Sequence, residues 1–138
     1  MKILNIILRV VLGLLLVSPI LGALGVFPPP TADLYNTPEA FAFIEMLMAT
    51  GYITYIIAIV FAICLVLVIM NRMALVALLL LPIVVNIVGF HLFLDGGLFT
   101  SGAIMANVLL LLNAYFLWQN WGRYKVLWNK SSAPQPQM

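Results

Sequence analysis

Four long apolar runs fill most of the chain, and short polar or turn-forming segments separate them. Each run is close to the roughly 20 residues that a helix needs to cross the hydrocarbon core of a bilayer. The sequence therefore predicts an all-α integral membrane protein, an antiparallel four-helix bundle in one domain over residues 1–130. The expected spans are about 3–26, 52–70, 74–94 and 101–121, and the polar tail 131–138 is expected to be disordered.

The polar segment between the first two runs contains a strong start signal for a further, short helix. The run Thr37-Pro38-Glu39 supplies a capping threonine, a proline for the first turn and an acid at the positive end of the helix dipole. A straight helix from Pro38 to Met70 would be about 50 Å long, too long for a bilayer core of about 30 Å. We therefore predict a bend at Thr50-Gly51 and a helix over residues 38–49 at the membrane surface.

The composition and the charge pattern agree with a membrane-embedded chain. Of the 138 residues, 65% are hydrophobic and 7% are charged, and a soluble domain of this size could not cover so apolar a surface. In a four-span arrangement all basic residues fall on one side of the membrane and all acidic residues on the other. The positive-inside rule then predicts that both termini are cytoplasmic. The net charge of +2 is too small and dispersed to indicate a nucleic-acid partner.

The third run contains the most informative polar residues of the chain. His91, the only histidine, and Asp95 are four residues apart, so the two side chains are expected to share one helical face. Asn86 lies about 140° around the helix from His91 and is expected to face a different neighbour. Its candidate partners are Asn107 of the fourth run and the main-chain carbonyl of Leu15, which Pro19 leaves without a helical donor.

Two interpretations of His91 remain open from the sequence. In the structural one, the imidazole caps the end of its helix by a hydrogen bond to Asp95 or to a loop carbonyl. In the functional one, it makes a polar contact with the head group of a quinone or a similar lipophile and relays a proton. The candidate ligand-binding residues are His91, Asp95, Asn86 and Asn107, and no catalytic residue is predicted.

Several kinds of chemistry find no support in the sequence. One cysteine, Cys64, excludes an intrachain disulfide, and together with one histidine it cannot supply the ligands of a metal or haem site. No nucleophile–base pair and no phosphate-binding loop is visible. We therefore expect no intrinsic cofactor, and at most a membrane subunit of a quinone-linked redox system rather than a self-sufficient enzyme.

Four short motifs occur along the chain, namely Arg9-x3-Gly13, Gly51-Tyr52, Asn71-Arg72 and Pro82-x3-Asn86-Ile87-x2-Phe90-His91-x-Phe93-Leu94-Asp95. Together they resemble the motifs of the DoxX-like family of small four-helix bacterial membrane proteins. The resemblance covers roughly residues 3–128, and it implies the bacterial inner membrane as the location. Many members have a glutamate in the second span, where this chain has Phe61, and an asparagine–lysine pair where it has Leu21-Gly22.

The resemblance and the residues together suggest two functions of different classes. Some relatives in the family are linked to thiosulfate:quinone oxidoreduction, which implies a non-catalytic or auxiliary protein that binds a quinone-like lipophile near His91. More distant relatives assist the assembly of other membrane proteins, so the alternative is a structural partner that stabilises another membrane protein. A lipophile site requires an outward-opening pocket that contains His91, whereas a partner role predicts an apolar, lipid-facing seam and copurification with another protein.

Overall fold

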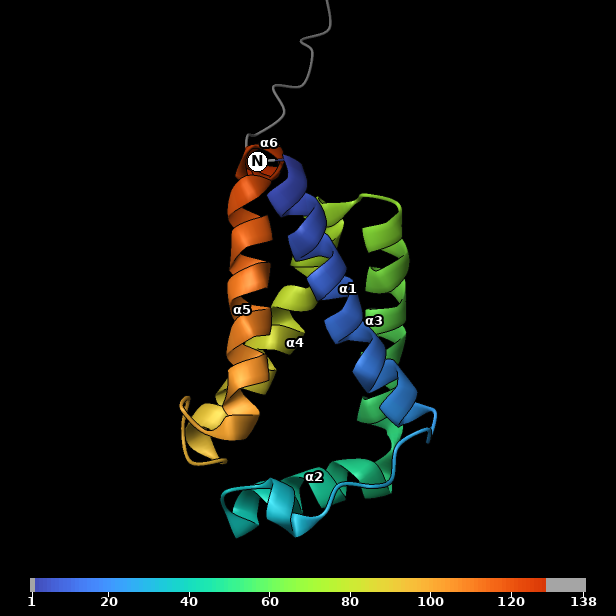
Figure 1. Cartoon of the computed structure of the whole chain (residues 1–138), viewed down its shortest axis with the longest axis vertical. Coiled ribbons are helices and arrows are strands. Elements are labelled where there is room, and N and C mark those ends of the chain that lie inside the picture. Colours follow the sequence, from blue (N-terminus) through green and yellow to red (C-terminus); the bar gives the residue numbers. More distant parts are fainter. Residues whose placement is uncertain (1, 129–138) are drawn as a thin grey trace, which may run out of the picture.

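The computed structural model describes residues 2–128, and all regular secondary structure in this part of the chain is helical, with no strand. Four of its helices are long and apolar enough to cross a membrane. They pack together as an antiparallel four-helix bundle of membrane type, so the predicted fold class is confirmed (Figure 1). The predicted tail 131–138 lies outside the described residues. The four long helices are α1 (Lys2–Ala23), α3 (Tyr52–Ile69), α4 (Met73–Phe93) and α5 (Ser101–Gln119).

The bundle core lies where α1, α3, α4 and α5 face one another. Helix α4 packs against α5 and α3, and α1 packs against α3. Large apolar side chains from all four helices fill the core, so burial of these side chains stabilises the bundle as a unit. Leu12, Leu16, Phe61, Leu80, Val84 and Phe116 are among the buried core residues.

The predicted surface helix forms α2 (Pro38–Thr50), which lies across one end of the bundle (Figure 1). It begins as the sequence predicts, because the Thr37 Oγ1 accepts a hydrogen bond of 3.1 Å from the backbone N–H of Ala40. Gly51 separates α2 from α3 and has a φ of 73°, a conformation that side-chain-bearing residues rarely adopt. The predicted bend at Thr50-Gly51 is therefore confirmed.

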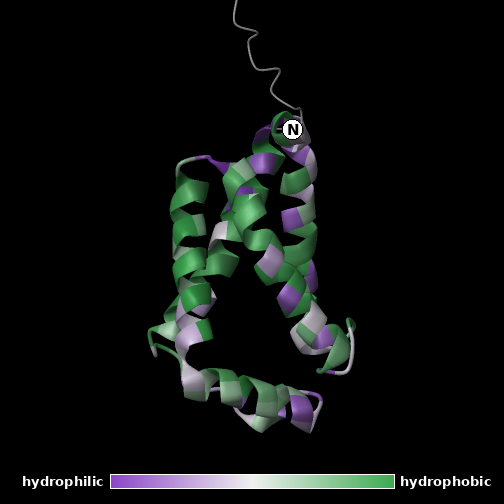
Figure 2. Cartoon of the chain, turned by 180° about the vertical axis from the view of Figure 1, so that it is seen from behind, coloured by the Kyte–Doolittle hydropathy of each residue, from purple (hydrophilic) through white to green (hydrophobic). Residues whose placement is uncertain are grey.

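The two ends of the bundle differ in charge. The N-terminus of α1, the turn between α3 and α4, and α6 (Trp121–Trp128) lie at one end, which we call the basic end (Figure 1). Helix α2 and the α4–α5 connection lie at the opposite, acidic end. Figure 2 shows hydrophobic residues along most of the four long helices between these ends. The described basic residues Lys2, Arg9, Arg72, Arg123 and Lys125 belong to the basic end, and Asp33, Glu39, Glu45 and Asp95 to the acidic end.

The end of the fourth span differs from the prediction, which continued it to residue 121. Helix α5 ends at Gln119, where the Asn120 side chain donates a 2.8 Å hydrogen bond to the carbonyl of Phe116. The chain then forms α6, whose buried Tyr124 donates a 2.7 Å hydrogen bond to the carbonyl of Ala74 at the start of α4. Local side-chain hydrogen bonds to the backbone compete with helix continuation at such positions.

Candidate functional site

The His91 and Asp95 side chains form a hydrogen-bonded pair at the end of α4. His91 Nδ1 lies 2.8 Å from Asp95 Oδ2, as the i,i+4 spacing predicts. Asp95 is almost completely buried, with 1% of its surface exposed, and the His91 side chain is 12% exposed. A buried carboxylate requires compensating hydrogen bonds, and the imidazole supplies one of them.

The second carboxylate oxygen of Asp95 joins the surface helix to the bundle. Asp95 Oδ1 accepts hydrogen bonds from the Asn36 backbone N–H at 2.8 Å and from the Asn36 side-chain amide at 3.3 Å. Next to this contact, the Thr37 hydroxyl donates to the carbonyl of Leu94. Asp95 therefore fixes both the ring of His91 and the start of α2.

These contacts determine the charge of Asp95. Burial by itself would raise the pKa of the carboxyl, but the hydrogen bonds from Asn36 and His91 outweigh burial and hold the pKa below its usual range. The carboxylate is then ionised at neutral pH and can only accept hydrogen bonds. Consequently the proton in the His91–Asp95 hydrogen bond resides on Nδ1 of the imidazole.

The other ring nitrogen of His91 takes no part in the Asp95 contact. Nε2 makes no hydrogen bond to any residue in the range 2–128. In the neutral ring with a proton on Nδ1, Nε2 is an acceptor, and in the imidazolium it is a donor. The ring can therefore accept a hydrogen bond from a hydroxyl group or donate one to a carbonyl group, depending on its protonation.

Gly102 of α5 allows the His91 ring to occupy its position. A Cβ atom at residue 102 would lie 3.1 Å from His91 Cε1, closer than the ordinary separation of carbon atoms, and 3.4 Å from Asp95 Oδ2. The absence of a side chain at this residue lets α5 approach the ring directly. Helix α5 therefore packs against the His91 ring, and the Asp95 carboxylate holds the Nδ1 atom of the same ring.

A cavity of about 690 Å³, which we call the α2–α4 cavity, lies between α2, α3 and α4. Its volume is within the range of about 300–1,000 Å³ that is typical of small-molecule sites. Most of its wall is apolar, and Phe43 and Phe90 stack in it with ring centroids 5.8 Å apart. The lining residues are Tyr35, Phe43, Ile44, Leu47, Ile53, Ile57, Pro82, Ile83, Asn86, Ile87, Phe90 and His91.

A second cavity of about 570 Å³, the central cavity, lies between α1, α3, α4 and α5. His91 and Ile87 line both cavities, so these two side chains lie where the cavities adjoin. Phe61 also lines the central cavity, and it occupies the position where the DoxX-like resemblance implies a glutamate. In this chain an aromatic ring occupies that position of the cavity wall. Apart from Tyr35, His91 is the only titratable residue that lines either cavity.

The asparagines do not make the contacts that the sequence suggested. Asn107 donates a 2.7 Å hydrogen bond to the carbonyl of Leu98, so the predicted Asn86–Asn107 pair is wrong. Within residues 2–128, Asn86 makes no hydrogen bond to Leu15 or to any other residue. It lines the α2–α4 cavity together with His91. Both residues line this cavity, but only His91 also lies against α5, at Gly102. Asn107 lines neither cavity and does not belong to the site.

Sequence reasoning missed Asn36, Tyr35 and Gly102. Asn36 is 59 residues from Asp95, and its only signal is that it precedes the predicted helix start. Tyr35 lines the α2–α4 cavity, and burial together with the nearby Asp95 charge raises the pKa of its phenol, which keeps the hydroxyl protonated. The described residues contain no group of three or more His, Cys, Asp or Glu side chains that could hold a metal ion.

Comparisons of the chain with models of known protein families, with curated proteins and with solved structures give no match. The resemblance to the DoxX-like family therefore stays a prediction from short motifs. The geometry of the His91 site is the stronger basis for a functional proposal.

Proposed function

We propose that this protein is an auxiliary, DoxX-like membrane protein that binds the ring of a quinone-like lipophile in the α2–α4 cavity, with His91 Nε2 as its principal polar contact. The observation that supports this proposal most strongly is the state of His91. Its ring is held by Asp95 through Nδ1, and its Nε2 has no partner among the described residues. A preorganised polar group in an apolar cavity is the usual arrangement of a ligand site.

The cavity wall suits a flat ring with polar substituents. Phe43, Phe90 and Tyr35 provide aromatic faces, and Phe90 meets Tyr35 edge to face at 6.3 Å. The exposed residue Asn86 lies about 7.5 Å from His91 along the helix axis, because the two are five positions apart and each position adds 1.5 Å. An amide without a partner is disfavoured within a membrane. Asn86 therefore supplies a second polar group for the same ligand.

The chemistry of His91 favours one redox form of such a ligand. When the ring is neutral, its Nε2 accepts a hydrogen bond, and its natural complement is the hydroxyl group of a hydroquinone. A quinone carbonyl is an acceptor, so it can contact only the protonated ring. We therefore expect the reduced, hydroxyl-bearing form to bind more tightly wherever His91 is neutral.

The location and the role of the protein follow from the same features. The basic end of the bundle supports an orientation in the bacterial inner membrane with both termini cytoplasmic, which places α2 and the His91 site at the outer surface. A lipophile site explains the cavity around His91, whereas a purely structural assembly role does not require one. A partner redox subunit or another membrane protein would supply any electron transfer.

The experiment is equilibrium binding of a short-chain hydroquinone, kept reduced, to the full chain in nanodiscs. We expect His91→Phe to weaken binding by about tenfold or more, because it keeps an aromatic ring but removes a hydrogen bond of about 1.4 kcal/mol. Binding is expressed per folded protein, because loss of the Asp95 contact should also cost about 1 kcal/mol of stability.

Asn107→Leu is the matched control for this experiment. Asn107 also loses one hydrogen bond on substitution, to the carbonyl of Leu98, but it lines neither cavity. We expect this variant to bind the hydroquinone with unchanged affinity. Equal affinity in the His91→Phe variant and the unmodified protein, or an equal loss in both variants, would contradict the proposal.

A further inference from the structure

The basic end of the bundle contains a polar cavity of about 510 Å³ that is remote from the His91 site. Three cationic side chains line it, namely Lys2 and Arg9 of α1 and Arg123 of α6. None of the residues that line it is acidic, and the described acidic residues belong to the other end of the molecule. The cavity therefore has an uncompensated positive charge, which favours an anion.

Amide side chains add hydrogen-bond donors to the three cations. Asn5, Asn71 and Asn120 line the same cavity. The Oδ1 atom of Asn5 accepts a hydrogen bond from the Tyr115 hydroxyl, so the amide nitrogen of Asn5 is left as a donor. Cations together with amide donors are the groups that bind phosphate oxygens.

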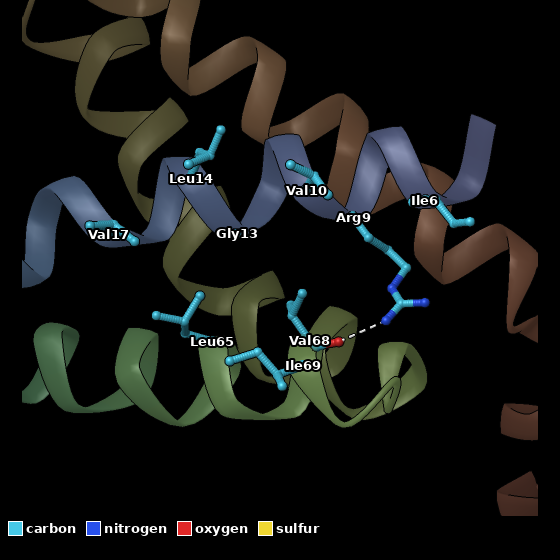
Figure 3. Close-up of a pocket in the computed structure, with 9 residues that line it drawn as sticks. All are labelled: Ile6, Arg9, Val10, Gly13, Leu14, Val17, Leu65, Val68 and Ile69. Carbon is cyan, nitrogen blue, oxygen red and sulfur yellow. Dashed lines mark hydrogen bonds between the residues drawn. The ribbon is translucent and has the colours of Figure 1, made fainter. Parts of the chain in front are cut away.

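Arg9 is the residue that connects this polar cavity to an apolar groove. Its guanidinium donates a 2.9 Å hydrogen bond to the carbonyl of Val68 near the end of α3. Figure 3 shows the other terminal nitrogen of the guanidinium turned away from that carbonyl. The buried Nε of Arg9 has no hydrogen-bond partner within the described chain. Arg9 therefore retains unused donors, although it is partly buried between two helices.

The apolar groove runs from Arg9 along the contact between α1 and α3 and has a volume of about 370 Å³. Val10, Leu14 and Val17 of α1 and Leu65 of α3 line it (Figure 3). Gly13 lies at the contact of the two helices, where a Cβ atom would already touch Leu65 at 3.7 Å. Ile6 and Arg9 line both the groove and the polar cavity, so the two spaces adjoin.

We propose that this composite site binds one anionic phospholipid. Its phosphate head group lies in the cavity formed by Lys2, Arg9 and Arg123, and an acyl chain lies in the α1–α3 groove. Two observations favour a lipid over a free anion. The apolar groove adjoins the cationic cavity, and Trp118 and Trp121 are exposed at the same end, as is typical of residues at head-group depth. Basic pockets between spanning helices are known to bind anionic lipid head groups.

The proposal is tested by native mass spectrometry of the detergent-purified full chain. Phosphatidylglycerol and phosphatidylcholine with identical acyl chains are offered in separate titrations, and inorganic phosphate is offered in a third. We expect one phosphatidylglycerol to be retained with an affinity roughly tenfold or more above that of phosphatidylcholine, because each basic group contributes to anionic lipid binding. Inorganic phosphate is expected to show no retention at the same concentration.

The variants separate a specific site from general surface charge. Lys2→Gln/Arg123→Gln removes two exposed cations of the cavity and should abolish most of the preference for phosphatidylglycerol. Arg72→Gln/Lys125→Gln removes the same charge from exposed residues at the same end that do not line the cavity, and it should retain the preference. Leu14→Trp fills the groove from an exposed residue and should weaken the retention of phosphatidylglycerol without loss of helical circular dichroism.

Three outcomes would overturn the proposal. The first is equal retention of the two lipids, and the second is an equal loss of preference in both double variants, which would indicate only general surface charge. The third is that inorganic phosphate is retained as well as phosphatidylglycerol is, and that Leu14→Trp does not change the retention of phosphate. This outcome would indicate a site for a free anion.

Discussion

Replacement of Asp95 with alanine is expected to lower the free energy of unfolding by about 3 kcal/mol. This carboxylate is 1% exposed and accepts hydrogen bonds from His91 and from the backbone and side chain of Asn36. Its loss leaves those donors without their acceptor and separates the start of α2 from the end of α4. Titration of the purified protein with a denaturing detergent, followed by circular dichroism, measures the effect.

Asp33→Ala is the matched control, since it removes one carboxylate from an exposed residue at the same end of the bundle. A surface substitution of this kind is expected to change stability by no more than about 0.5 kcal/mol. Equal effects of Asp33→Ala and Asp95→Ala would show that Asp95 does not connect α2 to the bundle.

The lowered pKa of Asp95 also predicts the pH dependence of the effect. Because the folded pKa lies below the unfolded one, the carboxylate contributes its stability above the unfolded pKa of about 3.9. That contribution is lost as the pH falls through the folded pKa. The difference in stability between the unmodified protein and Asp95→Asn should therefore shrink as the pH falls below the unfolded pKa and through the folded one.

Substitution of Gly102 with valine is expected to displace the His91 ring and to weaken hydroquinone binding by about tenfold or more. The first side-chain carbon would already lie 3.1 Å from His91 Cε1, and the two methyl groups of valine would need the space of the ring. The ring must then rotate, which breaks its hydrogen bond to Asp95. Overpacking of this kind should also cost about 1–3 kcal/mol of stability.

Gly89→Val is the control for this substitution. Gly89 is a helical residue of α4 near His91, and a Cβ atom at residue 89 would meet no other atom within 4 Å. The control variant is expected to retain binding and stability. Unchanged hydroquinone affinity in Gly102→Val would show that the position of the ring is not important for the ligand.

Much of the fold follows from local features of the sequence. Hydropathy predicts the four spans, because a bilayer requires long apolar helices whose backbone groups are satisfied internally. Thr37 and Gly51 mark the start and the end of the surface helix by capping chemistry and backbone freedom, and both are local properties. The His91–Asp95 contact is also local, since the helix itself sets the i,i+4 geometry.

The remaining features depend on contacts between distant segments. Asn36 meets Asp95 across 59 residues, and no periodicity indicates that pairing. Asn107 finds a backbone carbonyl in the adjoining loop instead of Asn86, because an amide can bond equally well to many acceptors. The cavities arise where four helices and α2 leave space between them, and their volume depends on helix orientation that hydropathy does not determine.

The most direct test of the His91 site is ¹⁵N NMR of the single histidine, in protein purified with a histidine-free tag. Labelling with ¹⁵N-histidine then reports one ring only. At a pH where the ring is neutral, we predict a protonated Nδ1 and an unprotonated Nε2, and a hydroquinone analogue should shift the Nε2 resonance while Nδ1 stays protonated. A ring with its proton on Nε2, or an Nε2 resonance that does not change at saturating analogue, would contradict the proposed site.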